Sequence, residues 1–498
     1  MSLGQTRRSE KIAAWLLPSA PVLVFALIFW EVLFFMPKII NAGDGDLGRH
    51  ITSGNLILSS GQIPTQDVFS HTMPGAPLYP KEWLSQVLFA LVYRAAGLNG
   101  IAWLTALVLA ATYGLLALGL RRLGVNLAVT LAGGIMASMV GSLHVLTRPH
   151  ILSWLLFTLF LLVLEDYRRT SRQRNLWLLI PLMILWANTH GAFIYGLVLV
   201  AFYSAGALLE GDRRRAMQLF ACTAVLVVAS FVNPVGPSML SHNLDFVQNR
   251  FLTDLSTEYA SPDLHSFSTW PFAALLLLSV AIVGRAGQRL NWTQVILLTG
   301  WSAFALYSVR NVPLYGQVAV LILAPCADTL LKEMLPATTR FLARLDQFDR
   351  MVKGWVWAVA VVVLLVGLEW SGTKLDPWGM GNAFDPHVFP VAAVDRLIAS
   401  PVEGKMFNDF NWGGYLLYRL WPDKQVFIDG WIDFYGEALT REYLQALNAE
   451  PGWETILDRY HVQWVIVAPT RPLAVRLDES AAWSLRYEDG VAGVWVRR

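Results

Sequence analysis

Two aspartates and a histidine follow the first long apolar segment, in the sequence Gly43-Asp44-Gly45-Asp46-Leu47-Gly48-Arg49-His50. Such side chains can transfer protons or bind a metal ion. The preceding segment, 12–36, has about the 20-odd residues that a bilayer-spanning helix requires. The carboxylates therefore lie at a membrane face, where ionisable groups are costly to desolvate and usually serve a function. Asp46 and His50 are four residues apart and would share one helix face.

Each aspartate also has a structural interpretation. Asp44 stands between two glycines, and Asp and Gly are the residues that turns favour. Asp46 would serve equally as the N-cap of a helix that begins there. Both interpretations remain open at the level of the sequence.

The composition predicts a polytopic membrane protein. Of the 498 residues, 55% are hydrophobic and 15% are charged, whereas soluble domains carry about 25% charged residues. The formal net charge is +2, and the basic residues form short clusters instead of one face, so we expect no nucleic-acid partner. Cys222 and Cys326 both lie in apolar segments, where they fit small buried side chains better than a disulfide or a metal site.

The apolar segments predict about eleven membrane crossings. These segments are 12–36, 99–120, 127–145, 151–164, 176–187, 192–209, 217–232, 271–283, 292–309, 312–331 and 354–370. A further apolar segment, 82–97, would disturb the alternation of sides if it crossed, so we expect it to lie as a short helix at the outer face.

The basic residues predict which side is cytoplasmic. Their clusters all fall on one side if the amino terminus is cytoplasmic and the crossings alternate. The clusters comprise Arg7, Arg8, Lys11, Arg121, Arg122, Arg168, Arg169, Arg172, Arg174, Arg213 to Arg215, Arg285, Arg289, Lys332, Arg340, Arg344, Arg350 and Lys353. The opposite side then receives a first outer loop (37–98), a second large outer loop (233–270) and everything after residue 370.

The outer loops and turns contain most of the polar residues that are unusual beside a membrane, and a helix bundle could gather them into one cavity. The candidates are Asp44, Asp46, His50, Lys81, Glu82, Arg148, His150, Asn188, His190, Glu258 and Arg310. Arg148 could instead be an interfacial anchor, His190 a helix cap and Glu258 a solvated loop charge. The hypothesis of a polar cavity therefore rests on all of these residues together and not on any one of them.

These residues resemble a known family. The first outer loop is similar to that of bacterial GT-C glycosyltransferases, in which an Asp, two aromatics and a His precede a Gly, an Ile-Pro and a Phe-Ser. Here Leu47, Gly48 and Arg49 replace the intervening residues. The matching elements are Asp46 and His50, Gly54, the segment Ile63-Pro64-Thr65-Gln66-Asp67-Val68-Phe69-Ser70, Glu82-Trp83-Leu84, Trp186-Ala187-Asn188-Thr189-His190-Gly191 and Val232-Asn233-Pro234-Val235-Gly236.

The resemblance covers about the first 330 residues and implies a fold, an activity and roles. It implies an integral membrane enzyme that transfers a hexosyl or pentosyl group from a polyprenyl-phosphate donor, with Asp46 as the catalytic carboxylate and Asp44 as second choice. One general base suffices for an inverting displacement. Cations would stabilise the departing phosphate, and the arginines are favoured over the histidine. The candidate cations are Arg148, His190, Arg310 and Lys81.

The expected partners follow from the same resemblance. They are a polyprenyl-phosphate-sugar donor, a lipid, glycan or protein acceptor, and the lipids of a bacterial cytoplasmic (inner) membrane. Asp44, Asp46, Glu258 and the histidines could form an oxygen and nitrogen metal site, but their spacing matches no known metal motif. We expect no obligatory cofactor, and a divalent metal remains an alternative.

The chain changes character after residue 370. We expect a transmembrane catalytic domain (1–370), a linker (371–389) and an extracytoplasmic α/β domain (390–498). The pattern predicts strands at 405–407, 425–428 and 462–467, helices at 413–421 and 437–448, and a hairpin turn at Asp489-Gly490. Polar residues at strand ends and nearby aromatics could bind a glycan or be purely structural. They are Asn408, Asn411, Asp429, Asp433, Trp412, Trp431 and Tyr435.

Two other functions fit the same composition. A transporter or flippase would also concentrate ionisable residues, but it should show internal repeats and charges near the membrane midplane, and neither is evident. A non-catalytic protein of envelope-polysaccharide assembly would make Asp46 dispensable.

Overall fold

The computed structural model describes residues 16–35, 44–286, 290–352, 354–370 and 382–498. Parts of four predictions lie outside these residues: both ends of the first crossing, the start of the first outer loop, most of the linker, and the basic residues Arg7, Arg8, Lys11, Arg289 and Lys353.

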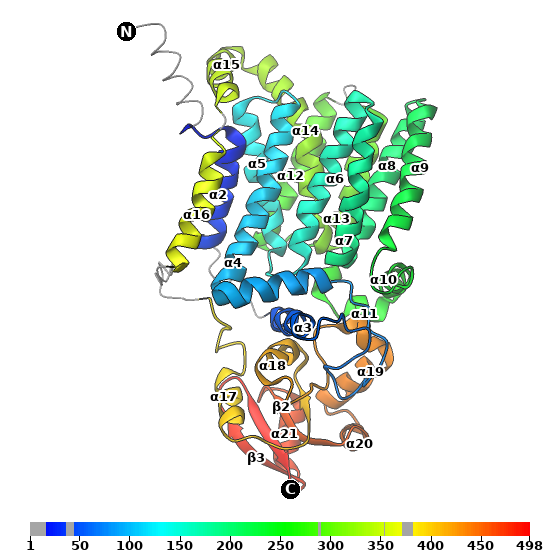
Figure 1. Cartoon of the computed structure of the whole chain (residues 1–498), viewed down its shortest axis with the longest axis vertical. Coiled ribbons are helices and arrows are strands. Elements are labelled where there is room, and N and C mark those ends of the chain that lie inside the picture. Colours follow the sequence, from blue (N-terminus) through cyan, green and yellow to red (C-terminus); the bar gives the residue numbers. More distant parts are fainter. Residues whose placement is uncertain (1–15, 36–43, 287–289, 353, 371–381) are drawn as a thin grey trace.

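A bundle of long helices forms the upper part of the molecule in Figure 1. Each predicted crossing falls on one of its helices, since backbone polar groups are satisfied within a helix even in lipid. The helices are α2 (Ala20–Phe35), α4 (Trp83–Arg122), α5 (Leu127–Gly141), α6 (His150–Thr170), α7 (Leu179–Thr189), α8 (Ile194–Leu209), α9 (Arg213–Ser230), α12 (Trp270–Ala286), α13 (Trp292–Tyr307), α14 (Val312–Met334) and α16 (Val356–Trp370). Within the described ranges, six helical segments are both long and apolar enough to cross a membrane. The total of eleven crossings stays a prediction.

Helix α4 is bent, and only its second part belongs to the bundle. Ala96 and Gly97 depart from helical geometry, and Gly97 has a φ of 59°, which favours glycine. The part before the bend, residues 83–95, lies across the end of the bundle in Figure 1, and we call it the α4 arm. It corresponds to the short helix that the sequence predicts there.

Helix α3 (Asp46–Ser60) lies between the α4 arm and helix α18 (Gly413–Leu420) (Figure 1). Glycines on both sides permit this packing. A Cβ atom on Gly48 would lie 2.4 Å from the carbonyl oxygen of Gly414, and one on Gly414 would lie 2.2 Å from that of Gly45. On the other side, a Cβ atom on Gly54 would lie 1.9 Å from the carbonyl oxygen of Gln86. The backbones of three helices therefore touch where only glycine fits.

The carboxyl-terminal part is an α/β domain below the bundle (Figure 1). Its four-stranded sheet has the order β1-β2-β4-β3, with β1 and β2 parallel and the other pairs antiparallel. The predicted turn Asp489-Gly490 does join two paired strands. Besides α18, the elements are α17 (Val391–Ala399), β1 (Lys405–Asn408), α19 (Ile432–Leu447), α20 (Trp453–Arg459), β2 (Val462–Val467), α21 (Pro472–Glu479), β3 (Trp483–Glu488) and β4 (Gly493–Arg497).

The predicted strand at 425–428 is wrong. The segment is extended, but the side chain of Asn408 accepts from the amide of Phe427 and donates to the carbonyl of Ile428, both at 2.8 Å. On its other side, Val426 exchanges two backbone hydrogen bonds of 3.1 Å with Phe69 and His71 of the first outer loop. A side-chain bridge therefore replaces a strand ladder, and the first outer loop is built into the carboxyl-terminal domain.

Other elements close the two ends of the bundle. In the second outer loop, α10 (Ser238–Gln248) and α11 (Arg250–Asp254) lie near α19. Helix α15 (Pro336–Met351) lies at the opposite end (Figure 1), where Arg121 pairs with Asp346 and Asp349.

The glycine contact predicts the effect of one methyl group. Gly48→Ala should lower the free energy of unfolding by about 1–3 kcal/mol, because the new Cβ forces α3 away from α18. Gly284→Ala is the control, since nothing lies within 4 Å of its Cβ position. The measurement is the thermal unfolding midpoint of both variants in detergent. Equal midpoints for Gly48→Ala and wild type would contradict the close contact.

Candidate active site

Arg148 lies at the centre of an ionic cluster at the outer-loop end of the bundle. Its guanidinium donates from Nη2 to Asp44 Oδ1 at 2.6 Å and from Nε to Asp44 Oδ2. Its Nη1 lies 2.9 Å from Glu258 Oε1 and 3.1 Å from Asp46 Oδ2. The structure thus brings together four predicted residues from three separate loops. A planar guanidinium suits this role because it offers five donors in a rigid fork.

Asp44 and Asp46 also shape the start of α3. Asp44 Oδ1 accepts from the backbone amide of Asp46 at 3.0 Å, which is the turn geometry that a Gly-Asp-Gly sequence allows. Asp46 is the first residue of α3, where a carboxylate interacts favourably with the helix dipole. The turn interpretation of Asp44 is therefore confirmed, whereas the N-cap interpretation of Asp46 is wrong, because Gly45 is the N-cap and no side chain caps the helix. The catalytic roles of both aspartates stay predictions.

Glu258 links Arg148 to Arg310. Glu258 Oε2 lies 3.5 Å from Arg310 Nε, and Arg310 Nη1 donates to the hydroxyl of Tyr259. Burial alone would raise the pKa of Glu258, but the charges of Arg310 and Arg148 outweigh it and hold that pKa at about 2. A cavity of about 300 Å³ adjoins this cluster. Its lining residues are Asp44, Leu143, His144, Val145, Leu146, Arg148, Thr257, Glu258 and Val309.

Glu82 is the centre of a second, looser group. Its carboxylate oxygens lie 3.7 Å from Arg49 Nη2, 3.8 Å from His50 Nδ1 and 3.7 Å from His190 Nε2, which are ion-pair distances and too long for hydrogen bonds. Burial lowers the pKa of His50 and of His190 well below the usual histidine value. Both imidazoles are therefore neutral at pH 7, so neither supplies positive charge to a phosphate there.

The carboxyl-terminal domain contributes two aspartates to this region. Asp433 on α19 binds Lys81 at 2.5 Å and His242 Nε2 at 2.9 Å. Asp429 lies 4.0 Å from Arg49 Nε, and the Arg49 guanidinium lies 4.3 Å from the centre of the Trp431 ring. These residues lie beside the first outer loop, not on a separate outer surface.

Asp46 is in direct contact with this domain through Gly430. A Cβ atom on Gly430 would lie 1.9 Å from Asp46 Oδ1, so no larger residue fits without moving the carboxylate. The segment Asp429-Gly430-Trp431 therefore forms one wall around Asp46. Arg148 forms the other.

Two further predicted site residues, Asn188 and His150, belong neither to the Arg148 cluster nor to the group around Glu82. The Asn188 amide accepts from Trp83 Nε1 at 2.7 Å and donates to the carbonyls of Ile184 and Val232. His150 Nε2 lies 3.1 Å from the carbonyl oxygen of His144. Both join helix ends to one another, and their binding of a substrate stays a prediction.

Several residues of the site were not singled out from the sequence. Arg49 counted only as a departure from the family pattern, although its position three residues after Asp46 places it within one helix turn. His144 lies at the end of the predicted crossing 127–145, and His242 and Tyr259 lie inside the second outer loop, where no local pattern distinguishes them. Their contacts depend on segments far away in the sequence.

An arginine side chain binds the carboxylates of the cluster. The Arg148 guanidinium occupies the position among the carboxylates of Asp44, Asp46 and Glu258 where a divalent metal ion would need oxygen ligands. No group of three or more His, Cys, Asp or Glu side chains elsewhere in the described ranges is arranged to hold one.

Comparison of the whole fold with solved structures finds archaeal membrane enzymes. An apo crystal structure of the oligosaccharyltransferase of Archaeoglobus fulgidus superposes with a TM-score of 0.56 at 11% identity, over 90% of this chain and 69% of that one. The same organism's oligosaccharyltransferase AglB, in complex with an inhibitory peptide and a dolichol-phosphate, gives a TM-score of 0.56 at 11% identity over 96% and 74%. The chain has a GT-C fold. The sequence itself matches no protein-family model and no curated protein.

The GT-C fold agrees with the resemblance that the first outer loop suggested. The structural match extends beyond the first 330 residues, since it covers at least 90% of the chain. The aligned residues therefore include much of the carboxyl-terminal domain. At 11% identity the likeness defines the fold, so chemistry has to be argued from the residues of this chain.

The pKa of Asp429 predicts a pH dependence of stability. Burial raises this pKa to about 7, whereas an unfolded aspartate titrates near 3.9. The folded state thus binds the proton more tightly, so this residue's contribution to stability falls as pH rises from about 4 to 7. Asp429→Asn should remove that loss of stability. The variant should be as stable as wild type near pH 4 and more stable than wild type above pH 7.

The measurement is the thermal unfolding midpoint at a series of pH values between 4 and 8. Asp423→Asn, at an exposed position of the same domain, is the control and should follow the wild-type curve. Parallel curves for Asp429→Asn and wild type would show that Asp429 does not titrate in this range.

Proposed function

We propose that this protein is a membrane glycosyltransferase that transfers a sugar from a polyprenyl-phosphate-linked donor to an acceptor. The observation that carries the proposal is the Asp46 carboxylate, held between Gly430 and Arg148, and Arg148 also lines a cavity that has both apolar and charged lining residues. The GT-C fold supports the class of enzyme. A lipid-linked substrate also suits a cavity at the end of a bundle of apolar helices.

Asp46 acts as the general base in this proposal. It takes the proton from an acceptor hydroxyl while that oxygen forms a bond to the anomeric carbon of the sugar. The bond between the anomeric carbon and the phosphate oxygen breaks, and the configuration inverts in a single displacement. Arg148 positions the base, because its Nη1 lies 3.1 Å from Asp46 Oδ2.

Arg310 is the best placed cation for the departing phosphate. Among the described residues its guanidinium has one hydrogen bond, to Tyr259, and a longer contact with Glu258. Arg148 directs most of its donors to carboxylates, and Lys81 is paired with Asp433. Free donors on a partly buried guanidinium are strong ligands for phosphate oxygens.

The proposed setting is the cytoplasmic membrane of a bacterium, with the amino terminus inside and the carboxyl-terminal domain outside. The asymmetry of the basic loops supports this orientation. In agreement, α15 with Arg340, Arg344 and Arg350 lies at the end of the bundle opposite the carboxyl-terminal domain (Figure 1). The acceptor is a lipid, a glycan or a protein.

Removing the base should abolish most of the transfer. Asp46→Asn keeps the size of the side chain but cannot take a proton, so the rate of sugar transfer should fall about 10²- to 10⁴-fold. Asp263→Asn, at an exposed position of the second outer loop, is the matched control and should retain the wild-type rate. The assay follows release of polyprenyl phosphate by purified protein with a panel of polyprenyl-phosphate sugars.

Two outcomes would contradict the proposal in different ways. Full activity of Asp46→Asn would remove Asp46 as the base and leave the enzyme class intact. No transfer by the wild type with any donor, together with binding of other envelope proteins, would favour the assembly-protein alternative.

The position of Arg148 among the carboxylates predicts that sugar transfer does not depend on metal ions. Because its guanidinium binds all three carboxylates, transfer should proceed at an unchanged rate in excess EDTA. Arg148→Lys keeps the charge but loses the fork, and the rate should fall about tenfold or more. Abolition of activity by EDTA and its recovery with Mn²⁺ or Mg²⁺ would contradict this assignment.

A further inference from the structure

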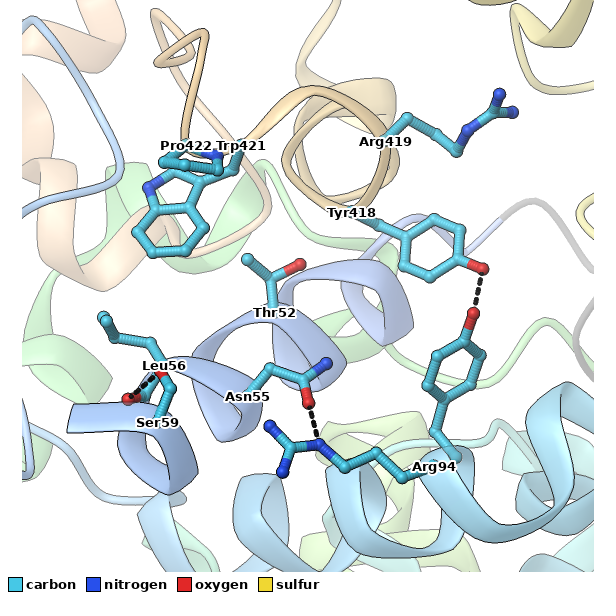
Figure 2. Close-up of a pocket in the computed structure, with 10 residues that line it drawn as sticks. Thr52, Asn55, Leu56, Ser59, Arg94, Tyr418, Arg419, Trp421 and Pro422 are labelled. Atoms are coloured by element: carbon cyan, nitrogen blue, oxygen red, sulfur yellow. Dashed lines mark hydrogen bonds between the residues drawn. The ribbon is translucent and has the colours of Figure 1, made fainter. Parts of the chain in front are cut away.

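A second cavity lies on the far side of α3 from Asp46. It has a volume of about 490 Å³, and α3, the α4 arm and the end of α18 enclose it (Figure 2). It is larger than the cavity of about 300 Å³ that adjoins Asp44. Its volume is in the range of small-molecule sites in proteins.

The two cavities are separated by the body of α3. Asn55 lines the second cavity and follows Asp46 by nine residues, which is two and a half helix turns and about 13 Å along the axis. The two side chains therefore leave opposite faces of α3. A ligand in the second cavity is not at the reacting centre.

Aromatic rings form much of the wall of this cavity. The hydroxyls of Tyr93 and Tyr418 are 2.7 Å apart and hydrogen-bonded, with ring centres at 5.8 Å. Trp421 follows α18 and lies across the cavity from Asn55 and Arg94 (Figure 2). Such rings offer an apolar face and a polar edge, which suits the C–H faces and hydroxyls of a sugar ring.

A solvent-exposed arginine with free donors lines the cavity. Arg94 Nε donates to Asn55 Oδ1 at 2.7 Å, and Figure 2 shows the two side chains pointing toward one another. Within the described parts of the chain, the other nitrogens of Arg94 and the Nδ2 of Asn55 have no hydrogen-bond partner and Arg94 has no acidic partner. Arg419, in contrast, pairs with Asp395 at 2.7 Å. The cavity therefore has one uncompensated positive charge.

We propose that this cavity binds a sugar residue that carries a carboxylate or a phosphate group. The guanidinium of Arg94 takes the anionic group through its free fork, the amide of Asn55 donates to a hydroxyl, and the rings of Tyr418 and Trp421 cover the sugar faces. This goes beyond the proposed transfer reaction, because binding here requires neither Asp46 nor a lipid-linked donor. It gives α3 a glycan on one face and the base on the other.

The test is direct binding of acidic and neutral oligosaccharides to the purified full-length protein without any donor. Oligogalacturonate and a malto-oligosaccharide of equal length are the probes, followed by calorimetry and by quenching of tryptophan fluorescence. The acidic probe should bind and the neutral one should bind about tenfold or more weakly, since a charge-assisted hydrogen bond is lost. Vesicles of phosphatidylglycerol in a parallel titration distinguish a lipid headgroup from a sugar as the source of the anion.

Two variants and a control locate the binding. Arg94→Gln should weaken binding of the acidic oligosaccharide about tenfold and leave binding of the neutral one unchanged. Trp421→Leu should weaken binding of both oligosaccharides. Arg476→Gln, at an exposed arginine of the carboxyl-terminal domain, should bind like wild type. The unfolding midpoint of each variant shows whether it has folded.

Three results would overturn the proposal. They are equal binding of the two oligosaccharides, unchanged binding of oligogalacturonate by a folded Arg94→Gln variant, and binding of phosphatidylglycerol with no binding of either oligosaccharide. Because no donor is present, each of these leaves the proposed transferase activity unaffected.

Discussion

The packing of α3 between the α4 arm and α18 determines the positions of Asp46 and Arg49 in the candidate site. Glycines at 48, 54 and 414 let backbones meet at distances that a Cβ atom would prevent. This close approach places Asp46 against Gly430 and, one turn along, Arg49 over Trp431. Because α3 is held from both sides, the membrane bundle and the carboxyl-terminal domain share one site. The carboxyl-terminal domain is thus part of the site and not an independent lid.

A second constraint is the balance of buried charge. Asp44, Asp46 and Glu258 are close enough to repel one another, and Arg148 offsets this by reaching all three. The arginine holds the carboxylates in one arrangement, as a preorganised site requires. It also occupies the position in which a metal ion would otherwise serve. Electrostatics and positioning of the base therefore depend on the same side chain.

The sequence predicted what depends on local pattern. Apolar runs identified the bundle helices, and Asp489-Gly490 marked the terminal hairpin, because both features are set by neighbouring residues. The extended segment at 425–428 was mistaken for a strand. One of its partners is the side chain of Asn408, and the other is the loop near Phe69, which is hundreds of positions away in the sequence. The contacts of Asp433 with Lys81 and His242 also depend on segments far away in the sequence.

Native-state hydrogen exchange of the intact protein in detergent tests most directly whether α3 and the carboxyl-terminal domain form one unit. If they do, the slowest amides of α3 and of strands β1 and β2 should exchange with the same opening free energy and the same dependence on denaturant. Loss of protection in α3 at lower denaturant, while β1 and β2 stay protected, would contradict the account. In that case Asp46 would not be held by the carboxyl-terminal domain.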